Sequence, residues 1–384
     1  MRHQNSVFHQ LTKQVPWAAF DAAVSRHGSD RRVRRLRTRD QFLALLYGQL
    51  SGAASLREIE DGLASQQARL YHAGLRGVSR STLSDANAKR SFEVYAEVFA
   101  AMARLTKPGL RRKLGGAVRL LDATKVNLSG PGARWARFSD NHCAAKLHIV
   151  YDPHGAVPLR CAVTPDRVND ITPAKAMPIE PGATYVFDLA YYSYQWWAEL
   201  DAAGCRFVTR LKKNAALKVL ETRPVAPGGA VLAERVGRLS RRLAASRANP
   251  FDKPVRVVTV RIDSGKRIDL LTNDLDTPAE EVAALYRQRW QIELFFKWIK
   301  QNLKIKHFLG TSENAVKTQV YVALIAFLIL RAAHDAQNEI PRPQAFARLV
   351  RLNIMHRRSI RNIKTPPKTP PNDARQITLH LNTA

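Results

Sequence analysis

Residues 277–306 read TPAEEVAALYRQRWQIELFFKWIKQNLKIK, and we expect them to form one helix around which the fold is organised. Thr277 can cap this helix, Pro278 suits its first position, and Glu280 completes a capping box. At about 100° per residue, a polar strip falls within about 40° of one line, beside an apolar stripe suited to a core. The strip holds Tyr286, Arg289, Glu293, Lys297, Lys300 and Lys304, and the stripe holds Leu285, Ile292, Phe296, Ile299 and Leu303.

Glu293 is the lone carboxylate in that cationic and aromatic strip. A solvated helix surface normally intersperses both signs of charge as i, i+4 pairs, and this strip does not. One interpretation is a basic helix whose glutamate is held in a salt bridge. The other is that Glu293 binds a metal ion while its neighbours hold phosphates.

The spacing of Tyr286, Arg289, Glu293 and Lys300 resembles the Y-R-E-K signature of DDE-class transposases of bacterial insertion sequences. The text at 294–301 and 308–319 is also similar to that group. The resemblance implies an α/β fold with a ribonuclease-H-like catalytic core. It also implies that Glu293 is the third carboxylate of a magnesium site, in which manganese could substitute.

The composition indicates a polyanionic partner. The 384 residues include 61 basic and 32 acidic side chains, a formal net charge of +29. Nucleic acid is the first candidate partner and an anionic membrane surface the second. The longest apolar run, 320–330, is too short to span a bilayer and suits a buried helix. Residues 1–10 contain no signal-type segment, and the spacing of the three cysteines matches no disulfide or zinc motif. We therefore expect a cytoplasmic, nucleoid-associated protein.

Residues 1–106 are expected to be helical. A helix at 40–50 follows an arginine-rich stretch, Ser55 and Glu58 are spaced as a capping box, and a further helix covers 79–90. This order allows a helix-turn-helix-like arrangement with 79–90 as the DNA-reading element, in which Arg80, Ser81 and Arg90 are candidate DNA contacts. An ordinary packing domain with a basic exterior is the open alternative. The family resemblance extends over 1–90 and favours binding of DNA ends.

Two further carboxylates are placed at predicted strand ends. In the predicted strand 117–125 the apolar run ends at Asp122, and the strand 183–188 closes with Asp188. A predicted helix at 193–204 and a strand at 206–212 follow. This is the rhythm of a partly parallel sheet, whose sites lie at the carboxyl ends of strands. Aspartate at a strand end is also a common turn residue. The resemblance assigns Asp122 and Asp188 as the other two metal ligands.

A hairpin is expected between those two aspartates. Its strands cover 146–151 and 156–164, and His148 alternates with core positions, which favours a structural role. The sequence departs from the family at Leu189-Ala190, where Arg-Gly is usual, and at 138–145, where basic residues and a glycine are usual. These departures leave open a slow or decayed copy.

The organisation we expect has five parts. They are a helical DNA end-binding domain at 1–106, the first part of the catalytic core at 107–212, a β-rich insertion at 213–272 ending in a hairpin, the last part of the core with the signature helix at 273–340, and a basic, partly disordered tail at 341–384.

Asp122, Asp188 and Glu293 would be the catalytic and metal-binding residues. Hard carboxylate oxygens suit magnesium, and two such ions about 4 Å apart can drive an in-line displacement at phosphorus. Tyr286, Arg289, Lys297, Lys300 and Lys304 would contact the DNA. By resemblance, the enzyme would cut at the terminal inverted repeats of its element and join the 3′-OH ends to target DNA, as a homodimer on DNA with a hairpin intermediate. The alternatives are a metal-dependent nuclease and an inactive, repressor-like DNA-binding protein.

Overall fold

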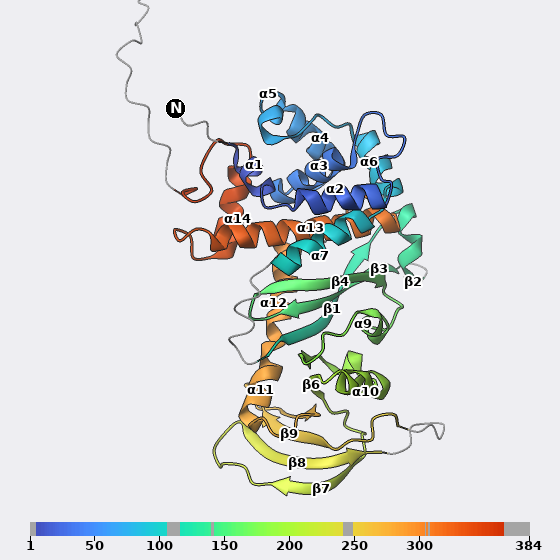
Figure 1. The fold of residues 1–384 in the computed structure, drawn as a ribbon, viewed down its shortest axis with the longest axis vertical. Helices are drawn as coiled ribbons and strands as arrows, with labels where there is room; N and C mark the ends of the chain where they lie inside the picture. Colours follow the sequence, from blue (N-terminus) through green and yellow to red (C-terminus); the bar gives the residue numbers. More distant parts are fainter. Residues whose placement is uncertain are drawn as a thin grey trace, which may run out of the picture.

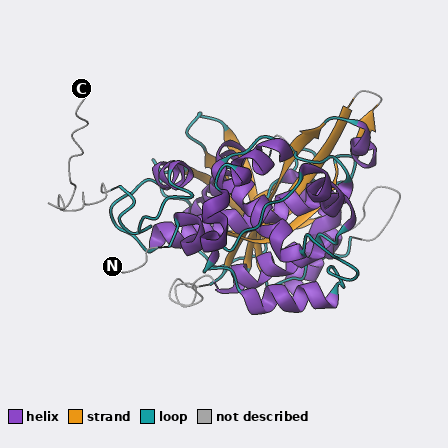
Figure 2. Ribbon diagram, turned by 90° about the horizontal axis from the view of Figure 1, so that it is seen from above, coloured by secondary structure: helices purple, strands orange, loops and turns teal. Residues whose placement is uncertain are grey.

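The computed structural model has three tiers along its long axis (Figure 1). Helices from both ends of the chain form one end, a mixed sheet with flanking helices lies in the middle, and long antiparallel strands form the other end. Viewed from above, the helical end covers much of the sheet (Figure 2). The structure describes residues 5–105, 116–139, 142–240, 249–303, 305 and 308–364.

The N-terminal region is helical, as predicted. Ser55 caps α4 and Ser79 caps α6, each through a hydroxyl that accepts a backbone N–H three residues on. Glu58 completes the first cap by accepting the N–H of Ala54. The helices are α1 Val7–Thr12, α2 Trp17–Arg26, α3 Thr38–Ser51, α4 Leu56–Ala64, α5 Gln67–Leu70, α6 Arg80–Lys89 and α7 Glu93–Leu105, with the short 3-10 turn η1 Tyr71–Ala73.

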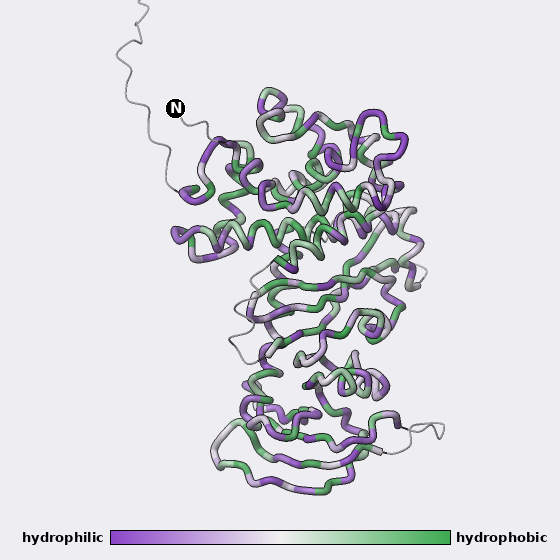
Figure 3. The backbone as a smooth tube through the Cα atoms, in the orientation of Figure 1, coloured by the Kyte–Doolittle hydropathy of each residue, from purple (hydrophilic) through white to green (hydrophobic). Residues whose placement is uncertain are grey.

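The helical tier is built around α13, Glu313–Asp335, which packs against α3, α6 and α7. The middle of α13 is mostly hydrophobic in Figure 3, and it contains the fully buried run 320–330 that was predicted as a core helix. Among the described residues, α13 is the one helix long and apolar enough to cross a membrane, and 78% of its most apolar window is buried. It is followed by α14, Pro343–Leu352. The burial of α13 is that of a core helix.

One sheet runs through the other two tiers, in the order β2-β3-β1-β5-β6-β10-β9-β8-β7, with β4 also paired to β3. The pairs β1–β5 and β5–β6 are parallel and the others are antiparallel. The predicted hairpins are present as β3–β4 and β9–β10. The strands are β1 Val118–Leu128, β2 Arg137–Ser139, β3 His142–Asp152, β4 Val157–Pro165, β5 Thr184–Val186, β6 Arg206–Arg210, β7 Leu217–Arg223, β8 Val231–Leu239, β9 Val255–Arg261 and β10 Arg267–Thr272.

Each face of the central strands has its own core. One face joins the apolar cluster of the helical tier, and the other packs on α10, which contributes Trp196 and Trp197. Ser193 caps α10 as expected for the predicted helix at 193–204. The elements around the central strands are α9 Ile171–Ala176, α10 Tyr194–Ala202, η2 Pro131–Ala136 and η3 Leu189–Tyr191.

The single helix predicted over 277–306 is wrong in two respects. Thr277 does not cap it, because its hydroxyl donates to Asp274 and the helix starts at Ala279 without a side-chain cap. The helix is also interrupted at Arg289, which separates α11, Ala279–Gln288, from α12, Trp290–Asn302. The hydrogen bonds from Arg289 N to Tyr286 O and from Ile292 N to Arg289 O span three residues, the tighter pattern of a 3-10 turn.

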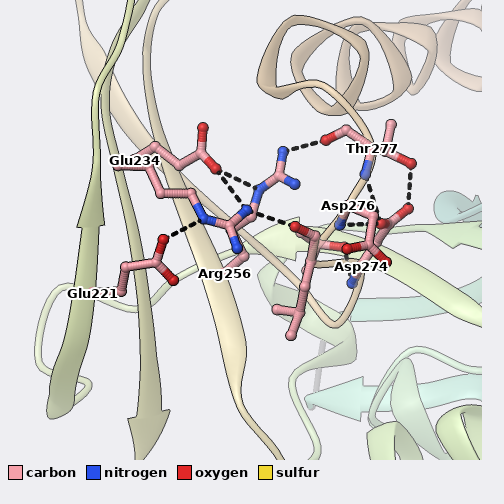
Figure 4. Close-up of polar contacts among 9 residues, drawn as sticks. Glu221, Glu234, Arg256, Asp274, Asp276 and Thr277 are labelled. Carbon is pink, nitrogen blue, oxygen red and sulfur yellow. Dashed lines mark hydrogen bonds and ion pairs between the residues drawn. The ribbon is translucent and has the colours of Figure 1, made fainter.

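A buried ion network fixes the start of α11 to the β-rich end (Figure 4). Arg256 of β9, with 1% of its side chain exposed, lies 3.3 Å from Glu234 of β8 and donates to the carbonyl of Thr277. Arg223 of β7 also contacts Glu234 and donates to the carbonyl of Leu275. Three strands are thereby tied to the loop that leads into α11.

We expect Glu234→Ala to lower the free energy of unfolding by about 3 kcal/mol, because it leaves Arg256 buried without its counter-charge. The matched control is Glu221→Ala, which removes the exposed partner of Arg223 and should cost about 1 kcal/mol or less. Urea unfolding followed by tryptophan fluorescence measures both. Equal losses in the two variants would contradict the role given to this network.

Candidate active site

The three predicted carboxylates lie around one hollow. It has a volume of about 440 Å³ and is open to solvent at one side of the sheet. β1 supplies Asp122, the turn after β5 supplies Asp188, and α12 supplies Glu293. We call it the carboxylate hollow; it is lined by Asp122, Ala123, Thr124, Asp188, Arg289, Glu293, Phe296, Lys297 and Lys300.

Asp122 is inside β1 and not at its end, which corrects the prediction. The parallel pairing of β1 with β5 stops at Leu120, and the strand continues to Leu128 beside β3 alone. Asp122 therefore lies just past the carboxyl edge of the parallel strands, where α/β sites form. Its Oδ1 accepts the Ala123 N–H at 2.8 Å, and its Oδ2 faces Arg289.

Asp188 follows β5 by two residues and caps the short turn η3, with its Oδ1 accepting the Ala190 N–H at 2.8 Å. The unusual residues Leu189 and Ala190 form this turn, and Tyr191 behind them is buried against Phe187 and Trp196. The local change from the family text thus leaves Asp188 on the wall of the carboxylate hollow.

Glu293 and Asp122 are joined by one guanidinium. Arg289 lies 2.7 Å from Glu293 through Nη2 and 3.4 Å from Asp122 through Nη1. About two turns along α12 from Glu293, Lys300 donates to the hydroxyl of Thr124 on β1 at 2.5 Å. Glu293 is therefore held in a salt bridge, as the first interpretation of the sequence has it, and it shares the hollow with two other carboxylates.

The electrostatics of the carboxylate hollow shift the pKa of Asp122. Burial, reinforced by the charges of Asp188 and Glu293, raises the pKa of Asp122 to about 6, against the opposing effect of the Ala123 hydrogen bond and Arg289. Burial and neighbouring carboxylates therefore disfavour the charged form of Asp122 in the protein without a bound cation. Within the described residues no three potential ligands are already grouped closely enough to hold a metal. The donor set, three carboxylates around an open hollow, nevertheless fits a hard divalent cation.

The other predicted contact residues divide into four groups. Lys297 is exposed at the rim of the carboxylate hollow, whereas Lys304 lies outside the described residues. Arg80 and Ser81 are exposed on the first turn of α6. Arg90 is engaged within the helical tier, where its guanidinium donates to Gln41 and to the carbonyl of Leu36.

A larger groove of about 940 Å³ adjoins the hollow between α11 and strands β6, β9 and β10. Tyr286 lines this basic groove, and Arg289 lines both cavities. Trp290, which is 60% exposed, was not among the predicted DNA contacts, although it directly follows Arg289 in the sequence. The charged residues of the groove are Arg210, Arg261, Lys266, Arg287 and Arg289, with Asp263 as the acidic exception.

Residues 113–329, more than half of the chain, match the transposase DDE domain family. The chain belongs to the DDE transposase family. It is 40% identical over 296 residues to the transposase y4zB of Sinorhizobium fredii, covering 76% of this chain and 82% of that protein. It is 28% identical over 266 residues to the transposase of insertion sequence IS5377 of Geobacillus stearothermophilus, covering 68% and 69%.

Two further matches concern the N-terminal region and the overall shape. Residues 3–76 of this DDE transposase match DUF4372, a domain family of unknown function. A piggyBac transposase chain from a synaptic complex with hairpin DNA aligns over 90% of this chain and 77% of its own, with a TM-score of 0.46 and 12% identity. The DDE domain match and the two transposase relatives show that the protein is an enzyme, a DNA transposase, and DDE transposase domains generally use divalent metal ions.

His148 faces away from the carboxylate hollow and behaves as a structural residue. It is paired in register with Ala123, so it shares the sheet face opposite Asp122, and its Nε2 lies 2.8 Å from Thr164 Oγ1. Burial lowers the pKa of His148 to about 4, with Lys146 adding to this effect and Asp170 opposing it. The folded protein thus resists protonation of this ring.

His148 and Asp122 should give opposite dependences of stability on pH. Unfolded histidine takes up a proton near pH 6.5, so this residue lowers the free energy of unfolding as the pH falls from about 6.5 to 4. Asp122 is protonated in the folded state from about pH 6 and in the unfolded state only near 4, so it raises that free energy over a similar interval. The two effects partly cancel in the wild type.

We expect His148→Gln to lose about 2–3 kcal/mol less stability than the wild type on acidification from about pH 7 to 4. Asp122→Asn should lose about 2–3 kcal/mol more, because it removes the compensating carboxyl group. Urea unfolding at a series of pH values gives both slopes. Unchanged slopes would show that these two groups titrate normally in the folded protein.

Proposed function

We propose that this transposase cleaves DNA at the terminal inverted repeats of its own insertion sequence and transfers the 3′-OH ends to target DNA. The observation that carries this proposal is the convergence of Asp122 and Glu293 on one guanidinium, with Asp188 on the same wall. The partly parallel sheet with α12 across one face is consistent with a ribonuclease-H-like core.

Asp122, Asp188 and Glu293 would hold magnesium, or manganese in its place. The bound ions would activate the attacking oxygen and stabilise the leaving oxygen of an in-line displacement. Lys300, oriented by Thr124, would hold a phosphate beside the scissile bond, and Lys297 at the rim would hold a neighbouring one. Arg289 and Tyr286 lie where the hollow meets the basic groove, so they would contact the strand that crosses from one to the other.

The domain roles in this proposal follow the predicted organisation. The basic groove and the β-rich strands would hold the DNA next to the cut, and the helical region would bind the end sequence through α6. The exposed first turn of α6 carries Arg80 and Ser81, and residue types of this kind contact phosphates and base edges. We further propose a homodimer on DNA, a hairpin step during excision, and action in the cytoplasm on nucleoid DNA.

The direct test is cleavage and joining of a labelled duplex that carries the end of the encoding insertion sequence. We expect products with magnesium, none with EDTA, and a loss of about a thousandfold or more in Glu293→Gln, because one of the three ligands is gone. Glu281→Gln, at an exposed carboxylate of α11, is the matched control and should remain active.

The products separate the alternative functions. Cutting without joined product would favour a plain metal-dependent nuclease. Binding of the end without cleavage under every condition would indicate an inactive, repressor-like protein and would refute the proposed activity for this copy.

A second prediction concerns the helical region. Arg80→Ala should weaken DNA binding and reduce the slope of log affinity against log salt by about one, with no loss of stability, because it removes one phosphate contact. Arg90→Ala should instead lower the urea midpoint, since its guanidinium is used inside the domain. Fluorescence anisotropy at several salt concentrations and urea unfolding measure the two effects. A destabilised Arg80→Ala with an unchanged salt slope would remove α6 from the DNA contact.

A further inference from the structure

Arg289 occupies the space between two of the carboxylates that the proposed function assigns to the metal. Its guanidinium lies 2.7 Å from Glu293 and 3.4 Å from Asp122, and 21% of the arginine side chain is exposed. The Oδ1 atom of Asp122 accepts the Ala123 N–H, and its other oxygen, Oδ2, is the one that Arg289 contacts. A cation bound by both carboxylates would meet this guanidinium.

We propose that Arg289 stands in for the metal ion in the DNA-free protein and must leave the carboxylates before a divalent cation can bind them. This inference rests on the proposed function, because it concerns the same three carboxylates. In this view the transposase without DNA has its acidic hollow neutralised by its own side chain. The arginine is an internal counter-ion, and DNA releases it.

Charge and hydrogen bonding favour this exchange. A guanidinium and a divalent ion repel each other strongly at short distance in a partly buried site, so the two would not share the carboxylates. Arginine binds carboxylate and phosphate through the same planar fork, which makes a DNA phosphate a suitable second partner. Transfer of Arg289 to a phosphate would leave Asp122 and Glu293 facing each other without a cation, which is the arrangement that attracts one.

The position of Arg289 suits movement between the two partners. It lies at the interruption between α11 and α12, and it lines both the carboxylate hollow and the basic groove. A DNA strand in the groove would therefore bring a phosphate within reach of the side chain while the two helices stay in place. Tyr286, whose ring lies 5.8 Å from the guanidinium, borders the same path.

The consequence is a coupling between DNA and metal binding. If DNA removes Arg289 from the carboxylates, DNA must raise the affinity for the metal, and the metal must raise the affinity for DNA by the same factor. The free enzyme would then carry little metal and would cut poorly away from correctly held DNA.

The test is the affinity for Mn²⁺, measured by electron paramagnetic resonance of the free ion, in the full-length protein without DNA. We expect Arg289→Gln to bind Mn²⁺ about tenfold more tightly than the wild type, a typical size for such coupling. Arg289→Lys keeps the charge but loses the fork, so its affinity should lie between the two. Lys297→Gln removes a positive charge from the rim of the same hollow and should change the affinity about twofold or less.

A second arm adds a short duplex DNA of mixed sequence. It should raise the Mn²⁺ affinity of the wild type and leave that of Arg289→Gln nearly unchanged. Circular dichroism checks that each variant is folded.

The outcomes distinguish this inference from the proposed function. Mn²⁺ binding that is lost in Glu293→Gln but is no tighter in Arg289→Gln would overturn the counter-ion role and leave the metal site intact. Equal tightening in Lys297→Gln would overturn it too, because it would reduce the effect to general charge. Failure of every folded protein to bind Mn²⁺, with and without the duplex, would overturn both proposals.

Discussion

The packing of α12 across β1 is the constraint on which the active site depends. Ile292, Phe295, Phe296 and Ile299 are buried on one side of this helix, and Phe295 meets the rings of Tyr151 on β3 and Phe327 on α13. Each fully buried side chain of this size contributes about 1.5–3 kcal/mol. The apolar contact fixes the rotation and height of the helix, and a slip of one turn, about 5.4 Å, would separate Glu293 from Asp122.

At several places in this protein an arginine side chain neutralises carboxylates that are buried or half-buried. Arg119 on β1 is buried beside the buried Asp152 and also contacts Glu180 at the surface, and Arg256 is buried with Glu234. Those two guanidinium groups are themselves almost fully buried, which suits a structural role. Arg289 makes the same kind of contact beside an open hollow and a basic groove. Exposure to a competing anion is what distinguishes an exchangeable counter-ion from a permanent one.

Sequence patterns predicted the elements well where local chemistry decides them. The caps at Ser55 and Ser79 depend on one hydroxyl and a backbone N–H nearby, and the buried middle of α13 follows from the apolar run 320–330. The three carboxylates were named from the family resemblance at the spaced signature and at two apolar runs, although Asp122 lies inside β1 and not at its end.

The same patterns could not predict features that depend on distant contacts. The apolar periodicity continues through Arg289 without a break, so nothing local indicates the interruption there. At this point the packing partners change, since α11 packs on β6, β8, β9 and β10 whereas α12 packs on β1. Thr277 failed as a cap for a local reason, because its hydroxyl donates to Asp274 three residues earlier. Thr124 became part of the site only through Lys300, which is distant in sequence.

Hydrogen bonds around the start of α13 connect the helical tier to the part of the molecule that carries the carboxylate hollow. Ser312 caps this helix, and the carbonyl of Thr311 just before it accepts a hydrogen bond from Trp135 beside the sheet. Asn314, in its first turn, donates to the carbonyls of Asn87 and Arg90 at the end of α6. α6 is thus attached to α13, whose Phe327 packs edge-on against Phe295 of α12, the helix that carries Glu293. A DNA end held by α6 would therefore be connected to Glu293 through packed helices, and the exchange proposed for Arg289 would need only its side chain to move.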